Sequence, residues 1–261
     1  MLYNLIGDIH GRDAWRQLVR EDAVNIFMGD YFDPYRKPRP MPSSCEALTN
    51  LEYIIAYKKA FPETILLLGN HDLHYLWDEH YLRYNPKWSK NYGDLIRDNW
   101  NLFQAAFSIG KRILVTHAGV TQPWCELAGI PKGLSVRELA DAINQRMNDE
   151  QQRHIFTAQF SMASDDKQGV SPSASPIWVR PETLRTHAHL LNSDGKEIIQ
   201  IVGHTQIEAV TLEPPFFFVD CLGYITQSLL VEYSDQGGYD FAEYEPKSFN
   251  DQFDTLIYVG M

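Results

Sequence analysis

The sequence has few cysteines and no long hydrophobic run. Its 261 residues include only three cysteines, Cys45, Cys125 and Cys221, which lie far apart and form no C-x-x-C pair. This spacing argues against a disulfide framework and indicates a reducing compartment. No apolar stretch approaches the roughly 20 residues that a membrane-spanning helix needs. We expect no signal peptide, because Asp8 directly follows the first short apolar run and its glycine. We therefore expect a soluble cytoplasmic protein with no membrane partner.

Positive charge is also scarce, with 23 Lys and Arg against 34 Asp and Glu, a net charge of −11. A protein that holds nucleic acid by its phosphates needs a basic surface, so we expect no binding to nucleic-acid duplexes. Small anionic substrates are compatible with this charge if cations at the site outweigh the distant acidic surface.

The length allows one large domain or two small ones, and we expect a single domain over residues 1–261.

Five short apolar runs end in similar polar sequences. They span residues 2–6, 23–28, 64–68, 111–115 and 198–202, and each stops at a glycine or threonine beside a His, Asp or Asn. Continuous apolar runs of this length are typical of buried central strands. In open α/β sheets, ligands collect beyond the carboxyl ends of the strands. The pattern therefore predicts strands that all point their polar ends at one site.

Helical patterns lie between these strands. Residues 13–21, 44–60 and 136–148 have helical spacing, and Ser43 with Glu46 and Ser135 with Glu138 form capping boxes. After residue 205 the pattern changes to strands without helices, at 216–219, 225–233 and 238–244. We predict an α/β fold with a core of mixed sheets.

The residues at the strand ends offer oxygen and nitrogen donors without a thiolate, which suits divalent Mn, Fe or Zn. This donor set is Asp8, His10, Asp30, Asn70, His117 and His204. Six ligands are too many for one catalytic ion that must keep an open position, but enough for two ions that share a bridging carboxylate. Two ions roughly 3.5–4 Å apart activate a bridging water and clamp phosphoryl oxygens. Hydrolysis of phosphate esters needs both effects.

Five segments together resemble the signatures of the calcineurin-like metallophosphoesterases. They are GDIHG at 7–11, GDYFD at 29–33, GNHD at 69–72, THAG at 116–119 and GHT at 203–205. Each segment is common by chance, but the five occur in the family's order, and the similarity extends over about residues 2–233. The closest branch looks like the phosphoprotein phosphatases, including phage protein phosphatases and bacterial diadenosine tetraphosphatases. The resemblance implies a single-domain β-sandwich of mixed sheets flanked by helices, in the order α/β/β/α.

The resemblance also implies a role for each site residue. Asp8 and His10 would bind the first metal ion, and Asp30 would bridge both ions. The second ion, Mn, Fe or Zn like the first, would be bound by Asn70, His117 and His204. His71 would be the general acid that protonates the leaving group, with Asp33 as its carboxylate partner. Such a carboxylate keeps an imidazole protonated and oriented near neutral pH.

Two positions depart from related sequences. Pro34 stands where the family has a phosphate-binding arginine, and Arg36 or Arg39 is a nearby substitute. Gln206 replaces the last histidine of the Gly-His-x-His segment of many phosphodiesterases, which matches the phosphoprotein phosphatase branch. Residues 178–180 resemble a Trp-x-Arg segment of bacterial members, so Arg180 would contact phosphate together with Asn70. Alternatively, residues 178–180 are part of a strand with one buried face.

Simpler interpretations apply to other residues. Asp and Asn beside Gly often only shape turns, and it is their combination here that favours metal binding. Asp220 is interpreted as a structural residue beneath the site. Histidines without a motif are interpreted as surface or packing residues, namely His74, His80, His154, His187 and His189.

Three functions are compatible with these motifs and this donor set. The first is a phosphomonoesterase that acts on a phosphoprotein or a small phosphate ester. The second is a hydrolase of dinucleoside polyphosphates or other nucleotides that uses the same site. The third is a catalytically silent binding module, which is disfavoured because every ligand position and the general acid are filled.

Overall fold

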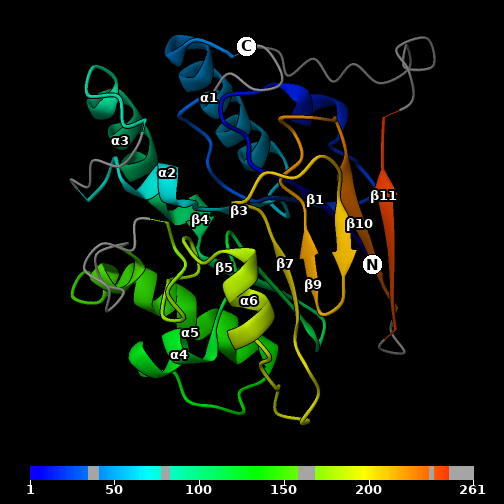
Figure 1. Cartoon of the computed structure of the whole chain (residues 1–261). Coiled ribbons are helices and arrows are strands. Elements are labelled where there is room, and N and C mark those ends of the chain that lie inside the picture. Colours follow the sequence, from blue (N-terminus) through cyan, green and yellow to red (C-terminus); the bar gives the residue numbers. More distant parts are fainter. Residues whose placement is uncertain (35–40, 78–82, 158–167, 235–237, 247–261) are drawn as a thin grey trace.

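The computed structural model describes residues 1–34, 41–77, 83–157, 168–234 and 238–246, which form two mixed β-sheets flanked by helices (Figure 1). The first sheet has the order β11-β10-β1-β2-β3-β4 and the second β5-β6-β7-β9-β8. The strands of the first sheet are β1 (Leu2–Ile6), β2 (Val24–Phe27), β3 (Ile65–Leu67), β4 (Phe103–Gln104), β10 (Ser228–Tyr233) and β11 (Tyr239–Tyr244). Those of the second are β5 (Ala106–Ile109), β6 (Ile113–Thr116), β7 (Ile199–Val202), β8 (Thr211–Glu213) and β9 (Phe216–Phe218).

Helices lie outside both sheets. They are α1 (Ser44–Ala60), α2 (Asn70–Leu73), α3 (Ser89–Asp98), α4 (Gln122–Leu127), α5 (Val136–Asn148) and α6 (Pro181–His187), with the 3-10 helices η1 (Ala14–Gln17), η2 (Trp100–Leu102) and η3 (Arg153–Phe156). Figure 1 shows α1 and α3 beside the first sheet, and α4, α5 and α6 beside the second. Within the described residues no helix is long and apolar enough to cross a membrane.

The alternation of side chains along the strands explains the layered arrangement. In β1, Tyr3 and Leu5 belong to an apolar cluster that contains residues of both sheets, whereas Ile6 belongs to the cluster that includes the helices. In β6, Val115 and Leu114 divide between the two clusters in the same way. Successive side chains of a strand point to opposite faces, so each sheet has one face in a shared interior and one face under helices. The four-layer α/β/β/α fold is confirmed.

Parallel pairing brings the carboxyl ends of the central strands to one edge. Strands β1, β2, β3 and β4 are mutually parallel, as are β6, β7 and β9, while β5, β8, β10 and β11 pair antiparallel with their neighbours. The loops that follow β1, β2 and β3 therefore meet the loops that follow β6 and β7. Loops at this edge can present polar groups while the strands stay buried.

The helix predicted over residues 13–21 is wrong, because only the four residues of η1 are helical. The carbonyl of Leu18 accepts a hydrogen bond from the side chain of Asn4 at 2.7 Å, and the Trp15 indole donates to Asn50 at 2.9 Å. The main-chain N–H of Arg20, which a continued helix would pair with a helical carbonyl, donates instead to the side chain of Asn25 at 3.0 Å. The capping boxes predicted at Ser43 and Ser135 are both confirmed.

Candidate metal centre and its acid

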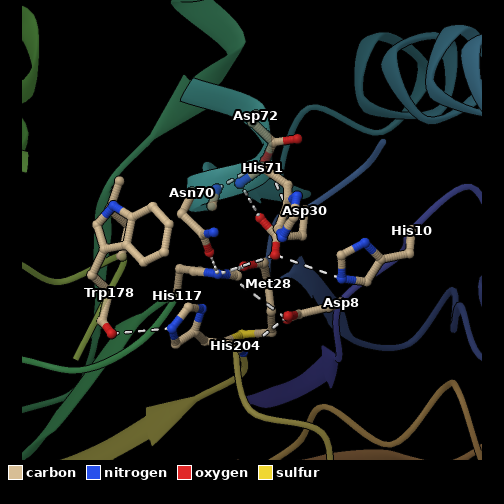
Figure 2. Close-up of polar contacts among 12 residues, drawn as sticks. Asp8, His10, Met28, Asp30, Asn70, His71, Asp72, His117, Trp178 and His204 are labelled. Atoms are coloured by element: carbon tan, nitrogen blue, oxygen red, sulfur yellow. Dashed lines mark hydrogen bonds and ion pairs between the residues drawn. The ribbon is translucent and has the colours of Figure 1, made fainter. Parts of the chain in front are cut away.

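The structure brings the predicted donor residues together at the common edge of the two sheets (Figure 2). All but His204 are buried, and each lies in the loop or first helical turn that follows a strand. Asp8 and His10 follow β1, Asp30 follows β2, Asn70 begins α2 after β3, and His117 and His204 follow β6 and β7.

The carboxylate of Asp72 ties two of these loops together. It accepts hydrogen bonds from the main-chain N–H groups of Asp30 and Tyr31 in the β2 loop, both at 2.8 Å. It also accepts one from the N–H of Gly69 in the β3 loop at 2.8 Å, and one from the hydroxyl of Tyr92 at 2.7 Å. A buried carboxylate with this many donors fixes the loop geometry.

A second link joins the two sheets. One carboxylate oxygen of Asp8, in the first sheet, accepts a hydrogen bond from the N–H of His204 at 2.9 Å. The N–H of Gly203 donates to the carbonyl of His117 at 2.7 Å, which aligns the two loops of the second sheet. The site is therefore assembled from both halves of the sandwich.

Backbone strain is concentrated at this site. His10, Asp30, Asp33 and His204 have φ values of 43°, 49°, 50° and 64°, in the left-handed region. Arg83 is the only other non-glycine residue with positive φ in the part of the chain that the structure describes. Such conformations cost roughly 1–2 kcal/mol each for residues with a Cβ, and they cluster where function requires a special geometry.

Two groups of His and Asp side chains could each hold a metal ion, and they share Asp30. One consists of Asp8, His10 and Asp30, the other of Asp30, His117 and His204, with the ligand atoms of each group within 4.8 Å of one another. The Nε2 atoms of His10 and His117 lie 3.6 and 3.5 Å from the same oxygen of Asp30. The side-chain oxygen of Asn70 is 3.2 Å from Nε2 of His117.

The three imidazoles of these groups are oriented by main-chain carbonyl groups. Nδ1 of His10 lies 3.0 Å from the carbonyl of Phe32, Nδ1 of His117 lies 2.8 Å from that of Met28, and Nε2 of His204 lies 3.1 Å from that of Trp178. A carbonyl only accepts hydrogen bonds, so these nitrogens carry the proton. The other nitrogen of each ring then keeps a lone pair, which a metal ligand requires.

Two buried atoms of these groups have no hydrogen-bond partner among the described residues. They are Oδ1 of Asp8 and Nδ1 of His204. Leaving a buried polar atom unpaired is costly, and such atoms in a native structure call for an explanation. A bound cation would satisfy both of them, so the residues present fit divalent metal ions.

The electrostatics of the site also fit a cation. Burial lowers the pKa of His10 to about 3 and lowers the pKa values of His117 and His204, so the three rings are neutral at pH 7. Neutral imidazole is the form that binds metal.

The neighbouring carboxylates crowd one another. Burial and the charges of Asp220 and Asp30 raise the pKa of Asp8 well above its usual range. Burial and the charge of Asp30 raise the pKa values of Asp72 and Asp220 to about 7. Cations among these groups would offset this repulsion.

His71 and Asp33 form a hydrogen-bonded pair beside the metal-binding groups. Nδ1 of His71 lies 2.8 Å from a carboxylate oxygen of Asp33, and 15% of the His71 side chain is exposed, against none of Asp33. Although burial opposes the shift, the charges of Asp30 and Asp33 raise the pKa of His71. These charges therefore favour the protonated form of the His71 imidazole, and its Nε2 is left free of the Asp33 carboxylate.

His74 was not recognised as a site residue in the sequence. It is buried, not on the surface, and its Nε2 lies 2.7 Å from the same Asp33 oxygen that contacts His71. Asp33, His71 and His74 make up a third group of close side chains. Its spacing of three residues from His71 was the available signal, since residues at i and i+3 of a helical turn lie on the same side.

Arg180 lies beside His204. Residues 178–180 are not part of a strand, so the alternative interpretation of this segment as a strand is wrong. It precedes α6 as its N-cap residue, and its Nε donates to the carbonyl of Gln168 at 2.8 Å. One terminal nitrogen of its guanidinium donates to the hydroxyl of Thr205 at 3.1 Å and to the carbonyl of His204 at 3.4 Å. Arg36, with Arg39, lies outside the described residues.

The comparison with known families agrees with this geometry. A family model described as calcineurin-like phosphoesterase matches residues 1–208. The match covers most of the chain and includes both groups that share Asp30, the pair of His71 with Asp33, and Arg180.

Proposed function

The chain belongs to the calcineurin-like phosphoesterase family, and on that premise we propose that it is a two-metal phosphatase of the phosphoprotein phosphatase branch. Its substrates are phosphate monoesters, in a phosphoprotein or a small molecule. The observation that carries the proposal is the sharing of Asp30 by two groups of metal-binding side chains. A single catalytic ion would need only one of these groups.

Each group has a distinct part in holding the ions, for which Mn is the first candidate. Asp8, His10 and Asp30 would hold one ion. The other would be held by Asp30, Asn70, His117 and His204. When bound, such ions supply Lewis acidity that activates water and offsets the charge of the phosphoryl group. The main-chain carbonyls that accept from the imidazoles keep each ring in the tautomer that binds metal.

His71 acts as the general acid. Its Nδ1 hydrogen is engaged by Asp33, so Nε2 delivers a proton to the leaving-group oxygen. The charges of Asp30 and Asp33 favour the protonated ring, which makes that proton available near neutral pH.

Arg180 binds the phosphoryl oxygens in place of the arginine that Pro34 replaces. Its guanidinium is oriented next to His204 by hydrogen bonds to Gln168 and Thr205. The side chain of Asn70 adds a second contact to the phosphoryl group. A guanidinium offers a planar pair of donors that matches phosphate better than lysine does.

A metal-dependence and substrate experiment tests the proposal. The protein is stripped of metal with a chelator, reloaded with Mn, and assayed with an aryl phosphate, a phosphopeptide and a dinucleoside polyphosphate. We expect hydrolysis of the two monoesters to disappear with the metal and return with Mn. A much higher kcat/KM for the dinucleoside polyphosphate would instead favour a nucleotide hydrolase. No turnover of any substrate by metal-loaded protein would contradict the proposal and favour a silent binding module.

A further inference from the structure

Three side chains converge on the carboxylate of Asp33. His71 and His74 approach Oδ2 to 2.8 and 2.7 Å through Nδ1 and Nε2 respectively, and the hydroxyl of Tyr75 hydrogen-bonds to Oδ1. Asp33 itself is 2% exposed and has positive φ, so its position depends on these partners. Among the three, only His71 is partly exposed to the site.

The direction of the Tyr75 hydrogen bond follows from its second partner. The main-chain N–H of Asn85 donates to the Tyr75 hydroxyl oxygen at 3.0 Å. Since an N–H cannot accept, the hydroxyl hydrogen is left for Oδ1 of Asp33. A chain of hydrogen bonds therefore runs from Asn85, in the segment before α3, through Tyr75 and Asp33 to His71.

Packing holds this chain in place. The ring of Tyr75 lies 4.4 Å from that of His74, stacks on Tyr84 at 5.0 Å, and meets Phe32 at 5.3 Å between ring centroids. These rings come from three segments of the chain and leave Tyr75 little freedom, so its hydroxyl is presented to Asp33 in one position.

We infer that His74 and Tyr75 are positioning residues for the reaction. Together they hold the Asp33 carboxylate in the orientation that directs His71 at the leaving group. The inference rests on the proposed function, because it assumes that His71 donates a proton. His74 and Tyr75 contact the Asp33 carboxylate on its remaining sides. They therefore hold it in the one orientation in which it accepts the hydrogen bond from His71. Neither side chain needs to touch the substrate.

A double-mutant cycle tests this role. Tyr75→Phe removes only the hydroxyl, so the ring packing is kept. On an alkyl phosphate, whose leaving group needs a proton, we expect kcat to fall on the order of 10-fold to 100-fold. On an activated aryl phosphate, whose leaving group needs none, kcat should change less than about 3-fold. In a His71→Asn background, Tyr75→Phe should cause no further loss on either substrate, because the residue that it positions is absent.

Two further variants separate positioning from stability. Tyr92→Phe is the matched control, since it also removes a buried tyrosine hydroxyl bonded to a carboxylate, that of Asp72. Any loss it causes should be equal on the two esters. His74→Leu should reproduce the selective loss of Tyr75→Phe, whereas His74→Gln, which can still donate to Asp33, should retain most of the activity on the alkyl phosphate. Metal content and Tm are measured for every variant.

Each outcome decides one claim. If Tyr75→Phe lowers kcat equally on both esters, or lowers it further in the His71→Asn background, Tyr75 acts through stability and the inference is overturned while the proposed function stands. If His71→Asn itself shows no dependence on the leaving group, the acid role is overturned and the inference with it. If the metal-loaded wild-type protein hydrolyses neither ester, the proposed function fails first.

Discussion

Replacing Gly69 by alanine tests the geometry of the site without touching a donor atom. Gly69 precedes Asn70 and lies against the β2 loop. A Cβ added at Gly69 would be 2.1 Å from Oδ1 of Asp30 and 2.7 Å from Cε1 of His117. Its φ of −105° is open to alanine, so the whole effect of Gly69→Ala is steric.

The size of the effect follows from these distances. Ordinary contacts of a Cβ begin at 3.4 Å, so the Asp30 carboxylate must move by about 1 Å, a misplacement that can cost roughly 100-fold in rate. Overpacking also costs about 1–3 kcal/mol of stability. We therefore expect kcat/KM for an aryl phosphate to fall about 100-fold, with weaker Mn binding and a lower Tm.

Two other glycines provide comparisons. Gly203→Ala would place its Cβ 2.2 Å from Oδ1 of Asp8, so we expect a loss of the same kind. Gly195→Ala meets nothing within 4 Å but has φ of +70°, so it should lower Tm and leave kcat/KM unchanged. If Gly69→Ala has wild-type kinetics and Mn affinity, the Asp30 carboxylate does not lie where the structure places it and the reasoning is refuted.

Three other expectations concern the acid, the phosphate contact and pH. His71→Asn should keep metal content and Tm but lose about 10²–10⁴-fold in kcat on an alkyl phosphate, with a smaller loss on an activated aryl phosphate; falling metal occupancy would show that its role has been misassigned. Arg180→Lys should raise KM and lower kcat for a monoester without changing metal content, and neutral kinetics would remove Arg180 from the phosphate site. In metal-free protein, the pKa values of Asp72 and Asp220, raised from 3.8 to about 7, contribute stability that is lost as pH rises from about 4 through about 7, whereas the lowered pKa values of His10, His117 and His204 contribute stability that is lost as pH falls below about 6.5. Mn favours the ionised carboxylates and the neutral imidazoles, so saturating Mn should raise the calorimetric Tm more at pH 7 than at pH 5; an equal rise at both pH values would contradict the assigned shifts.

The convergence of the expected donor residues could be predicted from the sequence because each is marked locally, while their role as metal ligands stays a prediction. Asp8, Asp30 and His204 each follow a glycine at the end of an apolar run, and parallel pairing brings such ends to one edge. Each capping box also lies within four residues, and both were predicted correctly. That residues 1–261 form one domain stays a prediction.

Features that depend on distant partners could not be predicted. His74 and Tyr75 contact Asp33, about 40 residues earlier in the chain; the spacing of His74 from His71 places those two histidines on one side, but no local pattern links either residue to Asp33. The helix expected at residues 13–21 is shortened to η1, and the hydrogen bond from Asn4 to Leu18 that accompanies this is visible only once β1 is placed. Local rules predict which residues end a strand, whereas tertiary hydrogen bonds decide which of the remaining polar residues join the site.

The central claim is that Asp30 joins two metal sites, and metal stoichiometry tests it most directly. Protein loaded with excess Mn and freed of unbound metal is examined by elemental analysis beside Asp30→Asn, whose amide removes the shared charge. We expect close to two Mn ions per wild-type chain, and a loss at both sites in Asp30→Asn. A content near zero in folded wild-type protein, or an Asp30→Asn variant that keeps both ions, would contradict the account.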